Sequence, residues 1–252
     1  MLAGYGSVRV LPKNGIKEEK RTRGLVKTLN LFDYSYSLTD AKKWLLKKRT
    51  SKEFGKIALT LKDLLLLDPM EDEIQQDLKE NQVWILKNGK KQSLEQQSDG
   101  YKTVIALAVD IMAFFMRENV SFELAEGIVL IDELGTHLHP RWKMRIVTSL
   151  RTAFPKLQFI VTTHEPLCLR GLNEGEVVVL KRDYETREVE TISDLPSPSD
   201  YRVDQLLTSE FFGLNSTSDP TVEATFNQYY RLLALSKLSN EESDQLKKMK
   251  AI

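Results

Sequence analysis

The amino-acid sequence predicts an α/β fold in which a parallel β-sheet is covered by helices and carries a helical lobe. Two segments, GIVLI at 127–131 and LQFIVTTH at 157–164, begin as apolar runs, the second interrupted only by Gln158, as strands buried on both faces of a parallel sheet do. The amphipathic segment PRWKMRIVTSLRTAF lies between them, with Pro140 near its first turn, and predicts a crossover helix. Strand, helix and strand in this order form a βαβ unit.

The N-terminal part predicts a strand, a charged loop and the lobe. Residues 2–11 alternate around two glycines and indicate a strand, or a strand pair with a tight turn. The basic stretch 13–27 predicts a solvated loop, with a phosphate-contacting patch as the alternative. SLTDAKKWLL predicts a helix capped by Thr39 or Asp40, and EFGKIALTLKDLLLL predicts a second helix of the lobe.

The rest of the chain alternates between helix and strand signals. VWILKNGKKQSL predicts a hairpin, because Asn88-Gly89 supplies the positive φ angles of a tight turn. QSDGYKTVIALAVDIMAFF predicts an apolar helix over 101–116, and EVVVLKRD a further strand, antiparallel at the edge of the sheet. YRVDQLLTSEFF and TVEATFNQYYRLLALSKL predict two terminal helices. The predicted organisation is sheet strands at 1–12, the charged loop and helical lobe at 13–80, the core at 81–195 and a C-terminal helical segment at 196–252.

Composition excludes several classes of protein. The 36 Lys and Arg residues balance the 36 Asp and Glu residues, so no overall charge recruits nucleic acid or an anionic membrane. The one cysteine, Cys168, excludes an internal disulfide and a thiolate metal cluster, which fits a reducing compartment. The longest apolar run is interrupted by Asp110 and is too short to span a bilayer. We expect a cytoplasmic protein.

Two adjacent carboxylates follow the first apolar strand. Asp132 and Glu133 stand at the carboxyl end of the 127–131 strand, where ligands bind in open parallel sheets. Neighbouring strand residues point to opposite faces, so we expect one carboxylate to hold hydrated Mg²⁺ while the other faces an attacking water. The alternative is an acidic turn that caps a helix.

A histidine ends the second apolar strand. Because neighbouring parallel strands end roughly 5 Å apart, His164 is expected to reach the same site as Glu133, where it can bond a γ-phosphate or orient a water. A metal cluster of Asp132, His137 and His139 is disfavoured, because the residues between and after the two histidines indicate a packed turn. A histidine that merely caps its strand is the other alternative.

The third candidate element is Ser98-Asp99-Gly100, at the start of the apolar helix. Backbone N–H groups at a helix amino terminus, a hydroxyl and a glycine that admits an oxyanion make a phosphate site. An ordinary N-cap is the alternative.

In this order the segments resemble the ATP-binding-cassette ATPases of the SMC and RecF-like class, in particular the prokaryotic AAA family ATPases often found in anti-phage defence systems of the Septu or retron-associated kind. QSDGYKT is similar to the signature motif, GIVLIDE to Walker B, LGTHLHP to the D-loop and FIVTTHEP to the switch-histidine strand. LAGYGSVR and YRVDQLLTSEFFGL are similar to the strand before the lobe and to the C-terminal segment. The resemblance covers nearly the whole chain and implies a P-loop-NTPase-like fold.

The resemblance also implies the ligands and the residue roles. ATP and Mg²⁺ would bind at a dimer interface, either in a homodimer or with a partner that carries the missing half of the site. Asp132 would bind Mg²⁺, Glu133 would be the general base and His164 would sense the γ-phosphate. The turn at 98–100 would cap the nucleotide held by the second protomer.

Three departures from the family pattern stand out. Gln97 replaces the leucine that usually precedes the signature serine, and Glu165 replaces the serine that usually follows the histidine. No G-x-x-x-x-G-K-[ST] occurs; the nearest pair, Gly89-Lys90, has Trp84 where the first glycine should stand. By the resemblance this phosphate-binding Walker A segment lies upstream, so the chain is expected to be the C-terminal half of a complete ATPase.

Three functional hypotheses follow. The first is an ATPase half that needs a Walker A segment from elsewhere, acting in phage defence or a DNA-related process with an effector protein. The second is an interaction module or remnant that keeps the fold without turning over ATP. The third, a nucleic-acid-binding effector subunit, depends on the basic stretch 13–27.

Overall fold

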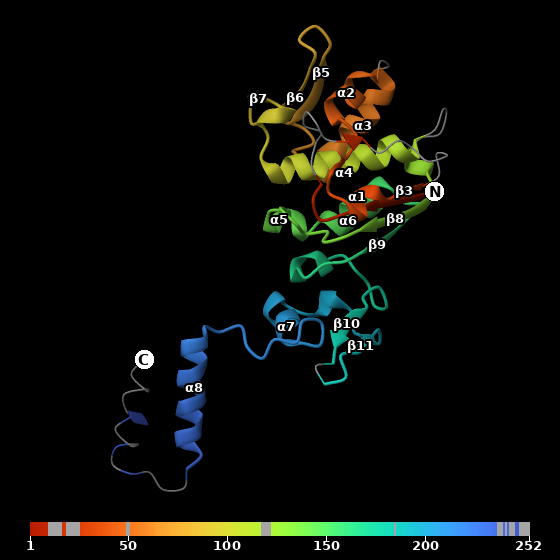
Figure 1. Ribbon diagram of the computed structural model, residues 1–252. Coiled ribbons are helices and arrows are strands. Elements are labelled where there is room, and N and C mark those ends of the chain that lie inside the picture. Colours follow the sequence, from red (N-terminus) through yellow and green to blue (C-terminus); the bar gives the residue numbers. More distant parts are fainter. Residues whose placement is uncertain are drawn as a thin grey trace. The chain divides into compact units, whose positions relative to one another are not determined.

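A computed structural model shows how the chain folds (Figure 1). The structure describes residues 1–9, 17–18, 26–48, 51–116, 122–183, 185–235, 239, 241 and 245–246. Most of the basic stretch 13–27 and the end of the helix expected over 221–238 therefore lie outside the described residues. The chain divides into two compact units, Met1–Glu176 and Val177–Ile252. None of the described helices is long and apolar enough to cross a bilayer.

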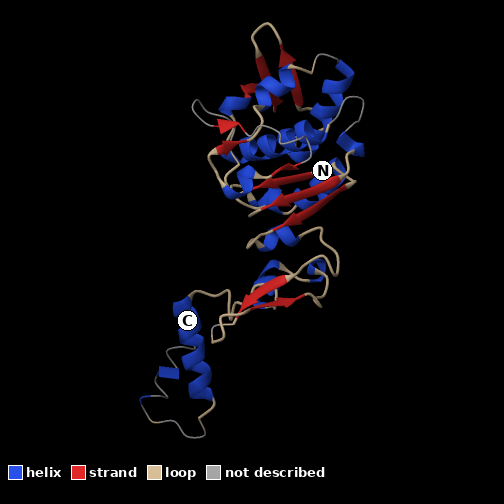
Figure 2. Cartoon of the chain, turned by 45° about the vertical axis from the view of Figure 1, so that its right-hand side comes forward, coloured by secondary structure: helices blue, strands red, loops and turns tan. Residues whose placement is uncertain are grey.

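The first unit is built on a four-stranded parallel sheet (Figure 2). Its order is β3-β1-β8-β9, with bounds Val26–Lys27, Leu2–Tyr5, Gly127–Ile131 and Leu157–Val161. β8 and β9 are parallel neighbours, as the two apolar runs predict. β1 lies between β3 and β8, so it is one strand inside the sheet rather than a strand pair with a tight turn.

The two faces of this sheet differ in burial. Ala3, Tyr5 and Val129 point to one face and are fully buried. On the other face Ile128 and Ile160 are 38% and 53% exposed. The expectation that both faces of β8 and β9 are covered is therefore wrong for the part of the chain that the structure describes.

The core surrounds helix α4 (Asp99–Phe115), which is buried along almost its whole length from Thr103 onward. It lies between the sheet and the lobe (Figure 1), where it contacts β1 on one side and α2 and α3 on the other. A helix with protein on both sides has no solvated face, which explains why its sequence is apolar all round.

The lobe combines helices with a small antiparallel sheet. Helix α2 (Ala41–Leu46) is capped by Asp40, whose side chain accepts from the Lys43 N–H; of the two predicted caps this one is confirmed. Helix α3 (Ser51–Leu64) follows. Asn88 and Gly89 have φ angles of 50° and 72°, which confirms the predicted hairpin turn. The sheet consists of β5 (Glu73–Asp77), β6 (Gln82–Lys87) and β7 (Lys90–Ser93), in that order.

The crossover between β8 and β9 is two helices rather than the single helix predicted. Helix α5 spans Pro140–Lys143 and helix α6 spans Ile146–Ala153. Arg145, between them, has φ −123° and ψ −12°, outside the helical region. No glycine or proline marks this break, so the sequence carries no local signal for it.

The second unit has its own small sheet. β10 (Val179–Arg182) pairs antiparallel with β11 (Val189–Ile192). The predicted strand is therefore antiparallel, but it belongs to a separate two-stranded sheet and not to the edge of the large one. Helices α7 (Val203–Thr208) and α8 (Pro220–Leu233) correspond to the two predicted terminal helices. The first is shorter than predicted, because residues 209–212 form a turn instead of continuing the helix.

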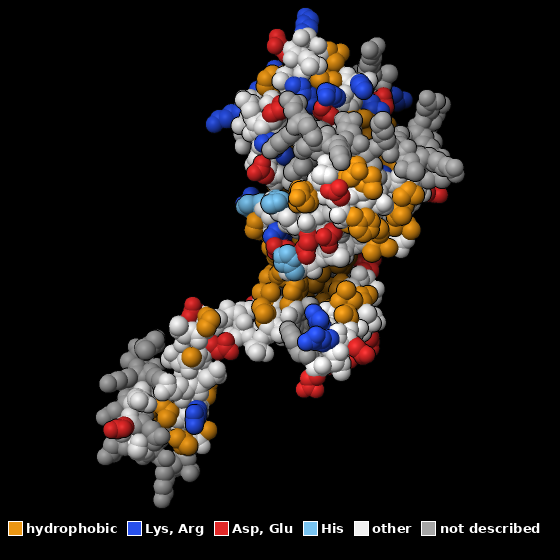
Figure 3. Space-filling view, in the orientation of Figure 1, with side chains coloured by type: hydrophobic (Ala, Val, Ile, Leu, Met, Phe, Trp, Pro, Cys, Tyr) orange, Lys and Arg blue, Asp and Glu red, His pale blue; other side chains and the backbone are white. Residues whose placement is uncertain are grey.

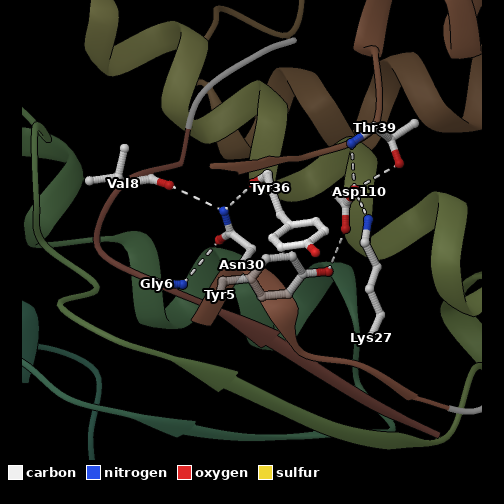
Figure 4. A network of polar contacts seen from close by, with 8 residues as sticks. All are labelled: Tyr5, Gly6, Val8, Lys27, Asn30, Tyr36, Thr39 and Asp110. Carbon is white, nitrogen blue, oxygen red and sulfur yellow. Dashed lines mark hydrogen bonds and ion pairs between the residues drawn. The ribbon is translucent and has the colours of Figure 1, made fainter. Parts of the chain in front are cut away.

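A buried polar network joins the sheet, α4 and the lobe (Figure 4). Asp110 interrupts the apolar surface of α4 and is fully buried. Its carboxylate accepts from the Tyr5 hydroxyl at 2.9 Å, from Lys27 Nζ at 2.5 Å, and from the Thr39 N–H and hydroxyl at 2.6 and 2.7 Å. Buried charges are retained only where they are paired and hydrogen-bonded, as this one is.

Segments beside this network complete the first unit. The short helix α1 (Leu29–Phe32) lies over Gly4 of β1, where a Cβ atom would come within 3.2 Å of the Leu31 side chain. β2 (Lys17–Glu18) and β4 (Tyr36–Ser37) form a two-stranded parallel pair. Of the described segments between β1 and α2, β3 pairs with the amino-terminal strand and α1 packs against it.

Candidate active site

Asp132 and Glu133 form an acidic turn directly after β8. The Asp132 N–H donates to the Tyr5 carbonyl at 2.8 Å, which extends the pairing between β1 and β8. Thr162, directly after β9, donates its hydroxyl to Asp132 Oδ1 at 2.6 Å and accepts from the Glu133 N–H at 2.9 Å. The main chains are also joined, since the Leu134 N–H donates to the Thr162 carbonyl at 2.9 Å. Thr162 therefore fixes both acidic residues against the neighbouring strand.

Thr162 is not among the site residues predicted from the sequence. Its signal was nevertheless present, because Thr162 is the first polar residue after the apolar run of β9 and faces the acidic pair across the sheet. A hydroxyl there can donate to one carboxylate and accept from the next N–H at the same time.

Glu133 adopts a left-handed backbone conformation, with φ at 52°. A residue with a side chain in this region carries about 1–3 kcal/mol of strain, and such strain clusters at functional sites. β8 ends at Ile131, so strand alternation does not separate the two carboxylates as expected. They are separated instead by this turn, which brings Asp132 to Thr162 and Glu133 to His164.

His164 contacts Glu133 directly, as the neighbouring strand ends predict. The distance from His164 Nδ1 to Glu133 Oε2 is 2.7 Å, and the imidazole is largely exposed. The hydrogen bond with Glu133 and the negative charge of its carboxylate raise the pKa of His164 above its ordinary value. Figure 3 shows histidine side chains on the same face as a group of acidic side chains.

Because of this contact, the pKa of His164 reports whether the Glu133 carboxylate lies beside the imidazole. Glu133→Gln removes the charge that favours imidazolium, so we expect the pKa of His164 to fall back toward its ordinary value, measured by NMR titration of the ring protons. Because the folded-state pKa is raised, the contact contributes stability that is complete below the unfolded pKa of about 6.5 and is lost as pH rises through the folded pKa. Glu126→Gln, which alters a carboxylate paired with Lys156, is the control. An unchanged titration curve in Glu133→Gln would contradict the contact.

The 98–100 turn packs on the D-loop-like segment of the same chain. Gly100 is buried, and a Cβ atom there would lie 2.9 Å from both the His137 carbonyl oxygen and the Trp142 ring. This close packing is sufficient to explain why residue 100 is a glycine, without a bound oxyanion. Ser98 and Asp99 are exposed, and the Ser98 side chain makes no capping bond. Among the described residues no hydrogen bond or ion pair joins either of them to the acidic turn.

The metal cluster considered from the sequence is not formed. Within the described ranges, no group of three or more His, Cys, Asp or Glu side chains is arranged to hold a metal ion. His139 has a structural role instead, because its Nδ1 accepts from the Arg141 N–H at 3.3 Å and caps α5. Asp132 offers a carboxylate beside the Thr162 hydroxyl, and oxygen donors of this kind suit Mg²⁺.

Two further groups border the site without acting as nucleophiles. Glu165, which departs from the family pattern, pairs with Lys143 of α5 at 2.5 Å. Its side chain also lies against Gly135, where a Cβ atom would approach Glu165 and Cys168 to 2.9 Å. Burial raises the pKa of the Cys168 thiol to about 11, so it stays protonated at neutral pH.

The chain is similar to proteins of known description. A family model described as "AAA domain, putative AbiEii toxin, Type IV TA system" matches residues 9–170. A protein of Bacillus mycoides (strain KBAB4) described as "Septu protein PtuA" is 39% identical over 249 residues, covering 99% of this chain and 34% of that protein. A "Retron Vc95 probable ATPase" of Vibrio cholerae serotype O1 biovar El Tor is 41% identical over 104 residues, covering 40% of this chain and 20% of that protein.

The chain spans about a third of the length of the first relative, and the part of it that aligns with the second covers a fifth of that protein. A solved structure described as "SMC head domain from Thermotoga maritima" aligns at 17% identity with a TM-score of 0.40, covering 60% of this chain and 50% of that chain.

Proposed function

Because the chain belongs to the family described as "AAA domain, putative AbiEii toxin, Type IV TA system", we propose that it supplies the water-activating and Mg²⁺-binding part of an ATP hydrolase. The observation that carries the proposal is the acidic turn at the carboxyl ends of two parallel strands, with the Glu133 carboxylate 2.7 Å from His164 Nδ1. The position of these residues at the carboxyl ends of parallel strands, together with their chemical types, supports a ligand site at this edge of the sheet.

In this proposal the residues of the turn have separate tasks. Glu133 accepts the proton of the attacking water, and His164 holds the Glu133 carboxylate in place and bonds the γ-phosphate. Asp132, oriented by Thr162, holds the metal side of the site. Bound Mg²⁺ would offset the negative charge of the phosphate groups. The exposed Ser98 and the helix amino terminus behind it are free to face a nucleotide on a second protomer.

We further propose that the whole protein acts in phage defence, the role implied by its resemblance to Septu and retron-associated ATPases; its relatives include a protein described as "Septu protein PtuA" and one described as "Retron Vc95 probable ATPase". Its partners would be a second copy or a chain with the phosphate-binding segment, together with an effector protein. A cytoplasmic location agrees with this role.

The phosphate-binding Walker A motif does not occur in this sequence. We expect the chain by itself to bind Mg·ATP weakly or not at all, because the backbone cradle and the lysine of G-x-x-x-x-G-K-[ST] are absent from it. Isothermal titration calorimetry measures this directly. The same titration after joining the chain to a segment with that motif should show binding and hydrolysis. Micromolar binding by the chain alone would contradict the half-site proposal, and binding without hydrolysis in the completed protein would favour the interaction module.

A further inference from the structure

Arg9 lies deep beneath the acidic turn. It follows β1 in the chain, is 2% exposed, and points its guanidinium at main-chain oxygens. Nη1 donates to the Asp132 carbonyl at 2.8 Å and to the Gly6 carbonyl at 3.1 Å. Nη2 donates to the Glu133 carbonyl at 2.9 Å and to the Leu134 carbonyl at 3.4 Å. One planar side chain thus binds three consecutive carbonyls of the turn, a geometry that the guanidinium fork provides and an ammonium does not.

These bonds complete the restraint on Glu133. Its N–H is held by the Thr162 hydroxyl and its carbonyl by Arg9, so both flanking peptide groups of the left-handed residue are fixed. Burial lowers the pKa of Arg9 to about 10, while the charges of Asp132 and Glu133 act in the opposite direction. Arg9 therefore remains cationic at neutral pH beside both carboxylates.

The segment that carries Arg9 is itself held in place (Figure 4). Asn30, 3% exposed, accepts from the Gly6 N–H at 3.1 Å and donates to the Val8 carbonyl at 3.4 Å. It also donates to the Tyr36 carbonyl at 2.7 Å, which ties this segment to the start of the lobe. A Cβ atom on Gly6 would lie 2.7 Å from the Asn30 carbonyl oxygen, so the close packing requires glycine there.

We propose that Arg9 is a positioning residue for hydrolysis: it holds the main chain at 132–134 so that the Glu133 carboxylate stays where it can take a proton from water. Arg9 acts through Glu133 and not on the nucleotide. This proposal rests on the proposed function, because it assigns Arg9 to a task that Glu133 performs.

The kinetic test uses the ATPase completed with its phosphate-binding segment. Arg9→Lys keeps the positive charge but loses the fork, and is expected to lower hydrolysis roughly 10²-fold, the loss typical of a misplacement of about 1 Å, with Mg·ATP affinity kept. In a Glu133→Gln background the same change should cause no further loss. Arg151→Lys is the matched control, since Arg151 also donates to a carbonyl, that of Gly171, away from the turn.

A second test needs no nucleotide and uses the chain as it is. In Arg9→Lys and in the neutral Arg9→Gln, hydrogen exchange should quicken at the Glu133 and Leu134 amides, which donate to Thr162, and stay unchanged along α4. Equal quickening along α4 would mean a general structural role and would overturn the proposal.

The outcomes separate the two claims. If Glu133→Gln abolishes hydrolysis while Arg9→Lys matches its parent, or if the two losses multiply, the positioning role is overturned and the proposed function stands. If Glu133→Gln hydrolyses normally, the proposed function fails, and unchanged exchange at the turn in both Arg9 variants would then overturn the structural part of the inference as well.

Discussion

Glu133→Gln is expected to lower ATP hydrolysis roughly 10²–10⁴-fold in the completed ATPase, the usual range for loss of a general base. The amide keeps the size of the carboxylate but cannot accept the proton of the attacking water. Binding of Mg·ATP should persist, so nucleotide-bound protein should accumulate. Single-turnover hydrolysis and equilibrium binding, measured on the same preparation, separate the two effects.

Two companion variants test the division of tasks at the turn. Asp132→Asn removes the charge directed at the metal, so it should weaken Mg·ATP binding itself, and a higher Mg²⁺ concentration should recover part of the loss. His164→Ala should keep binding and reduce turnover less than Glu133→Gln does. If Glu133→Gln hydrolyses ATP like its parent, the acidic turn is structural and the proposed function is wrong.

Asp110→Ala is expected to destabilise the first unit by about 3–5 kcal/mol, the usual cost of removing one partner of a buried ion pair. Lys27, 7% exposed, would be left buried without its carboxylate, and the Tyr5 and Thr39 hydroxyls would lose their acceptor. Since single domains are stable by only about 5–15 kcal/mol, this is a large share of the total. Urea unfolding followed by tryptophan fluorescence reports this unit, because Trp44, Trp84 and Trp142 all lie within it.

Asp99→Ala on the same helix is the control for this measurement. The Asp99 side chain is 91% exposed, and its change should alter stability by no more than about 0.5 kcal/mol. Replacing the pair together, as Lys27→Met with Asp110→Leu, should cost less than Asp110→Ala alone because no buried charge remains. Equal stability of Asp110→Ala and its parent would show that the network does not hold the unit together.

The parts of the fold that follow from local pattern were predictable. The apolar runs of β8 and β9 indicated neighbouring parallel strands, and this adjacency is confirmed by their register. It also placed Glu133 and His164 within reach of one another, where they are found. The roles of these two residues in hydrolysis remain predictions.

Contacts between distant segments left no such local mark. Nothing in LAGY indicates that β1 lies inside the sheet, because its partners stand far along the chain. Arg9 was missed for a similar reason: its acceptors are main-chain carbonyls, which every sequence supplies, so residue types could not reveal the contact. In the sequence Asp110 is visible only as an interruption of an apolar run. Its buried network could not be predicted, because its hydrogen-bond partners come from three other segments.

The interior place of β1 has a consequence for synthesis. Leu2 pairs with Ile128, so β1 leaves the ribosome well over a hundred residues before β8, and at about 5–20 residues per second the interval is roughly 6–25 s. Closing so long a loop is slow compared with forming local helices. During this interval the nascent chain can build the hairpins and helices of the lobe, whereas the edge of β1 that β8 will occupy stays open to other strands.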